Sequence, residues 1–125
     1  MAARLRPADP AAVESALGRI EAGDEVGDEV GDDADLRLLV KHFLAVLSLR
    51  APGNSVEMRV PPYAAAQVIP GVRHTRGTPP AVIELDARTW IALATGRCTW
   101  GAAIEGGTVR ASGERADLTP YLPLT

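Results

Sequence analysis

The stretch DARTWIALATGRCTWGAAIEGGTVRASG, residues 86–113, predicts a helix, a second short helix and a strand in close succession. Asp86 can cap the first helix, because its carboxylate can accept hydrogen bonds from the free amide groups of the first turn, and Gly96 can close that helix. Three apolar residues share one face of this helix: Trp90, Leu93 and Ala94. We therefore expect a helix between Asp86 and Gly96 that packs its apolar face on a core.

The second half of this stretch predicts a short helix followed by a strand. Thr99 can cap a helix that runs through Ile104, and the glycine pair at 106–107 stops it. Residues 108–112 then alternate, with Val109 and Ala111 on one side and polar residues on the other. This alternation is typical of a half-buried strand.

Three segments upstream also predict strands. Residues 55–60 alternate, with Val56, Met58 and Val60 on one face. Residues 63–69 and 81–85 are largely apolar and each follows a proline, although the first of them contains three alanines. We interpret all three as strands of one mainly antiparallel sheet.

Two helices are predicted before these strands. The first begins at Asp9-Pro10, carries Val13, Leu17 and Ile20 on one face, and ends near residues 22–23. The second covers about residues 34–49 and is apolar around most of its circumference. Such a helix is either a central core helix packed on a sheet or one wall of a ligand cavity. We interpret His42, beside its polar stripe, as a boundary residue and not as a catalytic base.

An acidic segment separates the two helices. The interval from Glu21 to Asp35 holds eight of the 16 acidic residues and no basic residue, so the rest of the chain is mildly basic. Its Gly-Asp-Glu-Val repeats favour neither burial nor a fixed backbone, and we expect a mobile loop at about residues 22–33. The acids do not follow the spacing of a calcium-binding loop. The arginines are dispersed and not interleaved with aromatic residues, so we expect no binding to nucleic acid.

The whole-chain properties predict one α+β domain over residues 1–125. No apolar run is long enough to cross a bilayer, and the first residues do not resemble a secretory signal. We therefore expect no stable membrane insertion and a cytoplasmic location. Cys98 is the single cysteine, so no internal disulfide can form. We expect no metal, no cofactor, no catalytic residue and no enzymatic activity, since neither a nucleophile motif nor a phosphate-binding loop is present.

Several motifs of the sequence, taken together in their order along the chain, resemble motifs of the sterol carrier protein 2-like family. They are the segments Asp86-Ala-Arg-Thr-Trp-Ile-Ala-Leu-Ala-Thr-Gly-Arg and Val109-Arg-Ala-Ser-Gly113, with Trp100, Ala103 and Gly106 between them. Two further segments, Val60-Pro-Pro-Tyr and His74-Thr-Arg-Gly-Thr-Pro-Pro80, are similar to a bacterial branch described as sterol carrier orthologues. The motifs span about residues 56–124. The acidic segment and the second helix carry no signature of the family.

The resemblance implies a mostly antiparallel sheet of about five strands covered by helices, with an apolar tunnel for a lipid, fatty acyl or sterol-like molecule. From facing pattern and expected position, the candidate ligand-binding residues are Phe43, Ile83, Trp90, Leu93, Ile104 and Val109. On this hypothesis the protein is a non-catalytic intracellular carrier. No cofactor is implied.

Two alternatives remain at this point. Arg73, His74 and Arg76 form a polar segment that could bind an anion, or whose arginines could instead reach carboxylates such as Glu84 or water. The same region is similar to the carboxy-terminal domain of mycothiol-dependent maleylpyruvate isomerases. The metal-binding domain of those enzymes has no counterpart in the sequence, so we expect no isomerase activity from this chain alone. A protein-interaction module with a filled cavity is therefore the alternative to a carrier.

Overall fold

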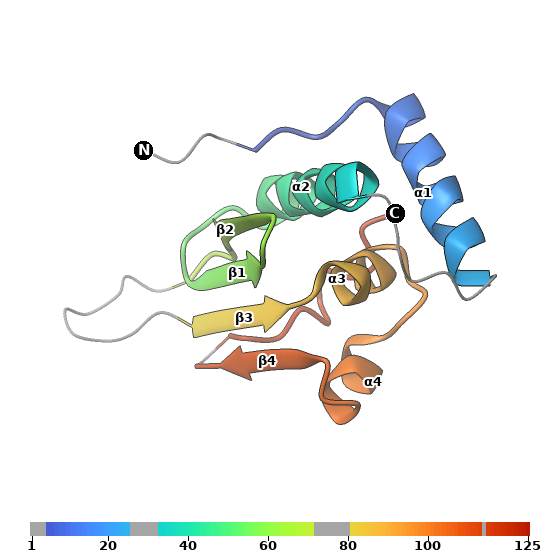
Figure 1. Ribbon diagram of the computed structural model, residues 1–125. Coiled ribbons are helices and arrows are strands. Elements are labelled where there is room, and N and C mark those ends of the chain that lie inside the picture. The colour runs from blue at the N-terminus through green and yellow to red at the C-terminus, as the bar shows by residue number, and fades with distance from the viewer. Residues whose placement is uncertain (1–4, 26–32, 72–80, 114) are drawn as a thin grey trace.

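The computed structural model describes residues 5–25, 33–71, 81–113 and 115–125. The helices in this part of the chain are α1 (Pro10–Glu25), α2 (Asp33–Arg50), α3 (Ala87–Ala94) and α4 (Trp100–Glu105). Its strands are β1 (Val56–Val60), β2 (Ala64–Val68), β3 (Ala81–Leu85) and β4 (Val109–Ser112). Figure 1 shows the strands side by side, with helices above and beside the sheet. The predicted α+β class is confirmed.

The sheet has the strand order β2-β1-β3-β4. β1 pairs antiparallel with β2, and β3 pairs antiparallel with β4, whereas the central pair β1 and β3 is parallel. The sheet is therefore mostly antiparallel, as expected, but the described residues form four strands where about five were expected. β2 ends at Val68, because the next residue, Ile69, has φ +71 and is followed by Pro70, a residue without an amide hydrogen. Two further prolines, at 120 and 123, likewise disfavour the formation of a strand in the C-terminal tail.

The boundary between the first two helices differs from the prediction. α1 continues to Glu25 and α2 begins at Asp33, so residues 22–25 and 33 are helical although we expected a loop there. Gly23 does not end α1, since one glycine in a helix costs only about 1 kcal/mol relative to alanine. The rest of the expected mobile loop, residues 26–32, lies outside the described residues.

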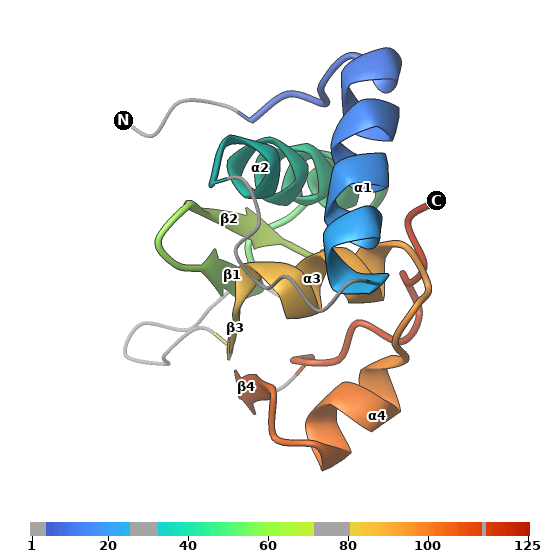
Figure 2. The ribbon, with the colours of Figure 1, turned by 45° about the vertical axis from the view of Figure 1, so that its right-hand side comes forward.

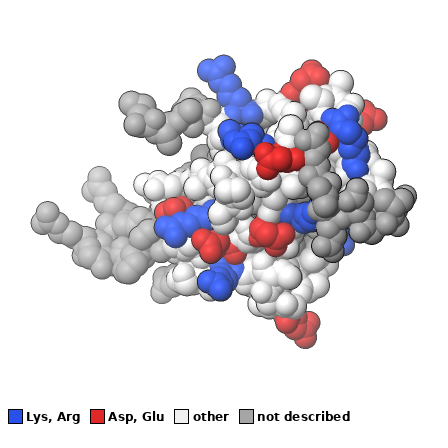
Figure 3. All heavy atoms as spheres, viewed as in Figure 1, with Lys and Arg blue, Asp and Glu red and all other residues white. Residues whose placement is uncertain are grey.

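The sheet buries one face and exposes the other. The buried side chains of the two central strands alternate as predicted: Val56, Met58, Val60, Ala81, Ile83 and Leu85. The opposite face carries polar side chains such as those of Arg59, Glu84 and Arg110. In Figure 3, acidic and basic side chains are interspersed on the side of the molecule turned to the viewer. The core therefore lies between the helices and one face of the sheet.

α2 is the central helix of the fold. It packs against α1, α3 and β2, so its wide apolar arc is covered on several sides. Its buried apolar residues are Leu39, Val40, Phe43, Leu44, Ala45 and Leu47. Figures 1 and 2 show α1 lying across α2. α2 is therefore a core helix packed against the sheet and against two other helices.

The caps predicted from residues 86–113 are formed. The Asp86 carboxylate accepts from the Thr89 amide at 3.1 Å, and the Thr99 hydroxyl accepts from the Ala102 amide at 3.1 Å. Gly96 follows α3 with φ +80, a left-handed conformation that glycine adopts without strain. This stretch therefore sets α3 and α4 by local rules.

The tail closes the domain near the end of α3. Leu118 and Leu124 are buried. The Leu124 amide donates to the Ala94 carbonyl at 2.8 Å, and the Arg50 guanidinium donates to the Leu124 carbonyl at 2.9 Å. The apolar tail therefore joins the C-terminal ends of α2 and α3.

Candidate functional site

Four of the six predicted ligand-binding residues lie in the interior. Phe43 of α2, Ile83 of β3, and Trp90 and Leu93 of α3 belong to one apolar cluster, and each is at most 1% exposed. Ile83 stands between Met58 and Ala111 in the sheet register. The structure thus brings these side chains from α2, α3 and the sheet into one apolar layer.

Trp90 joins two of these elements directly. Its side chain is 0% exposed, and its indole Nε1 donates to the Val40 carbonyl of α2 at 3.3 Å. The single polar atom of the side chain is therefore satisfied inside the core, while the ring remains available for apolar contacts. On α2, the ring of Phe43 meets that of His42 edge to face, with centroids 4.9 Å apart.

The other two predicted residues lie at the periphery. Val109 is 7% exposed and pairs with Leu85, so it borders the core at the start of the edge strand β4. Ile104 is 42% exposed and is not part of the interior. α4 is only six residues long and buries Ala103, so Ile104, one residue further round the helix, faces away. The structure therefore places Ile104 at the surface, outside the apolar layer of the other residues. Arg73, His74 and Arg76 lie outside the described residues.

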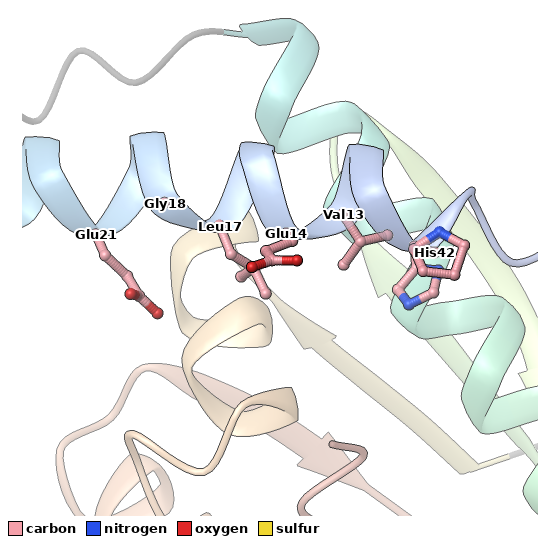
Figure 4. A pocket seen from close by; sticks show the side chains of 7 residues that line it. Val13, Glu14, Leu17, Gly18, Glu21 and His42 are labelled. Atoms are coloured by element: carbon pink, nitrogen blue, oxygen red, sulfur yellow. The ribbon is translucent and has the colours of Figure 1, made fainter.

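A long hollow follows one side of α1, as Figure 4 shows. It has a volume of about 700 Å³ and opens to solvent. Its lining residues are Pro10, Val13, Glu14, Leu17, Gly18, Glu21 and His42. Val13 and Leu17 give it apolar surface, while Glu14 and Glu21 place two carboxylates along it. Such a hollow suits an apolar or cationic ligand better than an anionic one.

His42 anchors the segment before α1. The Ala8 amide donates to His42 Nδ1 at 2.9 Å, so the neutral ring carries its proton on Nε2. Burial lowers the pKa of His42, because desolvation disfavours the charged imidazolium. The neutral form is therefore the one that holds the chain against α2.

A paired ion bridge fixes α1 on α2. Arg19 donates from Nε and Nη2 to the two carboxylate oxygens of Asp35, each at 2.8 Å. Asp35 is only 5% exposed, and Arg19 holds the pKa of this carboxyl below its usual range. The two parallel hydrogen bonds tie α1 to α2 at this point.

A second hollow, of about 370 Å³, lies where α1 reaches α3. It is lined by Ile20 of α1, by Arg88, Thr89, Ile91 and Ala92 of α3, and by Arg97, Cys98 and Thr108. Arg88 and Arg97 are not among the site residues that were predicted from the sequence. They lie nine positions apart within residues 86–113, but their common hollow exists only because α1 packs beside them.

A third hollow, of about 550 Å³, covers the outer face of the sheet. It is lined by Arg59, Val82, Glu84, Val109, Arg110, Ala111 and Ser112. Glu84 lies opposite Arg59 in one register and opposite Arg110 in the other, so its charges are of mixed sign. Phe43, Ile83, Trp90 and Leu93 line none of the three hollows, because in this structure their side chains pack on one another.

The described residues contain no group of three or more His, Cys, Asp or Glu side chains placed to hold a metal ion. Among the helices of the described ranges, none combines the length and the apolar character that a membrane span requires.

Comparison with known proteins identifies the family. The model of a protein family described as bacterial SCP ortholog matches residues 32–124, which is more than half of the chain. The match includes α2, α3, α4 and all four strands, and it begins after α1. No curated protein matches the sequence. The chain therefore belongs to the bacterial SCP ortholog family, a bacterial family of sterol carrier protein type.

Proposed function

We propose that this protein is a non-catalytic carrier of a lipid, fatty acyl or sterol-like ligand, held between the helices and the sheet. The observation that carries the proposal is the continuous apolar layer formed by Phe43, Ile83, Trp90 and Leu93 in a chain of the sterol carrier type. Because these residues come from both sides of the layer, a ligand that enters between them contacts α2, α3 and β3 together.

The driving force would be the removal of apolar ligand surface from water. Burial of about 400 Å² of acyl surface at about 25 cal/mol per Å² is worth roughly 10 kcal/mol before the costs of association. Because Phe43 and Trp90 are at most 1% exposed, a ligand must also displace contacts that these side chains make with one another. We therefore expect affinity in the micromolar range rather than tighter binding.

The surroundings of Cys98 and His42 support a non-catalytic function. Cys98 Sγ lies 3.4 Å from the Thr99 carbonyl, which is not a base that could activate a thiol. His42 uses Nδ1 to accept from the Ala8 amide. A nucleophile needs a base within hydrogen-bond reach, and neither residue has such an arrangement with the other groups described.

A second candidate function is a protein-interaction module that keeps the fold and fills the interior with side chains. It is favoured by one observation: the predicted ligand residues are closely packed and buried, while the three hollows given above open to solvent. On this alternative, no lipid enters the layer that Trp90 occupies.

The test uses the two tryptophans of the chain as separate reporters. In Trp100→Phe, emission comes from Trp90 alone, and in Trp90→Phe it comes from Trp100 on α4. A brominated fatty acid quenches tryptophan only at close range. The carrier hypothesis predicts saturable quenching of Trp90 and much weaker quenching of Trp100.

Two negative results together would contradict the carrier hypothesis. If the brominated acid leaves Trp90 emission unchanged up to its solubility limit, and if native mass spectrometry finds no lipid bound to the freshly purified protein, the carrier hypothesis is wrong. A brominated sterol, used in the same way, separates sterol from acyl selectivity.

A further inference from the structure

The hollow where α1 reaches α3 has positively charged side chains at its sides and an apolar floor. Arg88 and Arg97 line it from α3 and from the turn that follows, and its described lining includes no acidic residue. Ile20 and Ile91, at 4% and 2% exposure, belong both to this lining and to the apolar core. The floor of the hollow is therefore formed by residues of the apolar core.

The arginines are the groups of this hollow that can bind an anion. The hydroxyl of Thr89 donates to Asp86 at 2.6 Å, and that of Thr108 donates to the Ala103 carbonyl at 3.1 Å, so both hydroxyl protons are engaged. A guanidinium group offers a planar fork of donors that matches a carboxylate or phosphate. Arg88 and Arg97 also have interactions within the chain, which an incoming anion would join or displace.

The position of α1 makes this hollow a suitable entrance. α1 has its main packing partner in α2, where the Arg19–Asp35 bridge fixes it, and its contact with α3 is the lesser one. The family match begins after α1, although α1 contributes Ile20 to the core. Separation of Ile20 from Ile91 would open the core while leaving the ion bridge in place.

We propose that this hollow binds the anionic head group of a single-chain amphiphile, with Arg88 and Arg97 on the head group and the apolar chain passing between Ile20 and Ile91. The inference rests on the proposed carrier function and names its entrance and its ligand class. The shared chemistry is an oxyanion on an apolar chain, whether carboxylate or phosphate. The acidic hollow along α1 lacks this complementarity, because Glu14 and Glu21 line it.

The experiment compares charged and neutral ligands of equal chain length. Binding of lauric acid, dodecyl phosphate and methyl laurate is measured by calorimetry on the full chain and on the double variant Arg88→Met, Arg97→Met. We expect the double variant to bind the two anions about 10-fold or more weakly, since two charge-assisted contacts are lost and both are partly solvated. The methyl ester should bind both proteins equally.

A matched control is Arg59→Met, Arg110→Met, which removes two arginines from the outer face of the sheet. This variant should bind all three ligands as the unmodified protein does. Equal losses for the acid and the ester in the Arg88 and Arg97 variant would overturn the head-group assignment. So would unchanged binding of both anions.

Two further outcomes separate this inference from the proposed function. If none of the three ligands binds the unmodified protein, the carrier hypothesis itself fails. If inorganic phosphate without a chain binds as tightly as dodecyl phosphate and is lost in the double variant, the hollow is a site for a free anion, and the entrance is overturned.

Discussion

His42 makes the attachment of the chain before α1 sensitive to pH. Its Nδ1 can accept from the Ala8 amide only while the ring is neutral, and protonation turns this atom into a donor. Because burial holds its pKa below the usual 6.5, the unfolded chain takes up this proton more readily than the folded chain. The stabilising contribution is therefore complete above about pH 6.5 and is lost as the pH falls through the folded pKa.

We predict that His42→Gln removes part of the pH dependence of stability. Glutamine offers an acceptor to the Ala8 amide but does not titrate, so between pH 7.5 and 5 the unmodified protein should lose more unfolding free energy than the variant, by about 1 kcal/mol. Urea unfolding at both pH values measures this. Asp35 and Asp117, whose pKa values lie below 3.8, lose their contributions only at lower pH. Identical pH profiles for the two proteins would contradict the assignment.

Gly113 ends the motif of residues 86–113 for a steric reason. Its φ is +91, and a Cβ atom there would lie 2.8 Å from the Ala81 Cα atom of β3. Gly18 in α1 is the matched opposite, because nothing lies within 4 Å of a Cβ atom at that position.

We predict that Gly113→Ala destabilises the fold by about 2 kcal/mol or more, since it adds a left-handed strain to a backbone clash. Gly18→Ala should stabilise it by about 0.5–1 kcal/mol through helix propensity. Thermal and urea unfolding of the two variants give the comparison. A neutral Gly113→Ala would mean that β3 and the residue after β4 are less closely packed than described.

The contact between α1 and α2 depends on one ion bridge with one buried end. The Arg19 side chain is 60% exposed, whereas the Asp35 side chain is 7% exposed. The Glu57 and Arg59 pair on the outer face of the sheet provides a comparison, with side chains 27% and 49% exposed. Burial of one partner reduces solvent screening, so the first pair should contribute more than the second.

A double-mutant cycle with Arg19→Met and Asp35→Asn should give a coupling energy of about 1–2 kcal/mol, below the full value of a charged hydrogen bond because Arg19 is largely solvated. The cycle Arg59→Met with Glu57→Gln should give about 0.5 kcal/mol or less. Both are measured by urea unfolding. Equal coupling energies for the two pairs would show that the bridge does not fix α1.

Most helices and strands could be predicted from local sequence rules, but how they pack on one another could not. Asp86, Thr99 and Gly96 predict the ends of α3 and α4, and the alternation of residues 56–60 predicts which face β1 buries. Alternation is the same for parallel and antiparallel partners, so it could not predict that β1 and β3 run parallel. The end of α1 was missed because Gly23 weakens a helix without terminating it.

The candidate site shows the same limit. Trp90, Leu93, Ile83 and Phe43 were predicted to face the interior because a periodic pattern identifies core positions. Whether core positions line a cavity depends on packing between elements, which no pattern states. Arg88 and Arg97 were missed because their hollow requires Ile20, about 70 residues earlier in the chain.

The whole molecule has one apolar layer whose side chains pack closely on one another. α1, which lies outside the family match, covers part of this layer. A carrier of this kind must open its interior when a ligand enters, and the seam between α1 and α3 offers both the apolar base and the charges for an anionic amphiphile. The same closed packing would suit a protein-interaction module. The two hypotheses differ in one respect: in a carrier the core side chains contact the lipid, whereas in an interaction module they contact only one another.

The carrier hypothesis requires that an apolar ligand lie between the helices and the sheet. NMR with a carbon-13-labelled fatty acid and methyl-labelled protein measures this directly, through nuclear Overhauser effects between ligand chain and side-chain methyl groups. The carrier hypothesis predicts such effects at Ile83 and Leu93 in the interior. Effects confined to Val13 and Leu17 in the hollow along α1, or none at all at saturating fatty acid, would contradict it.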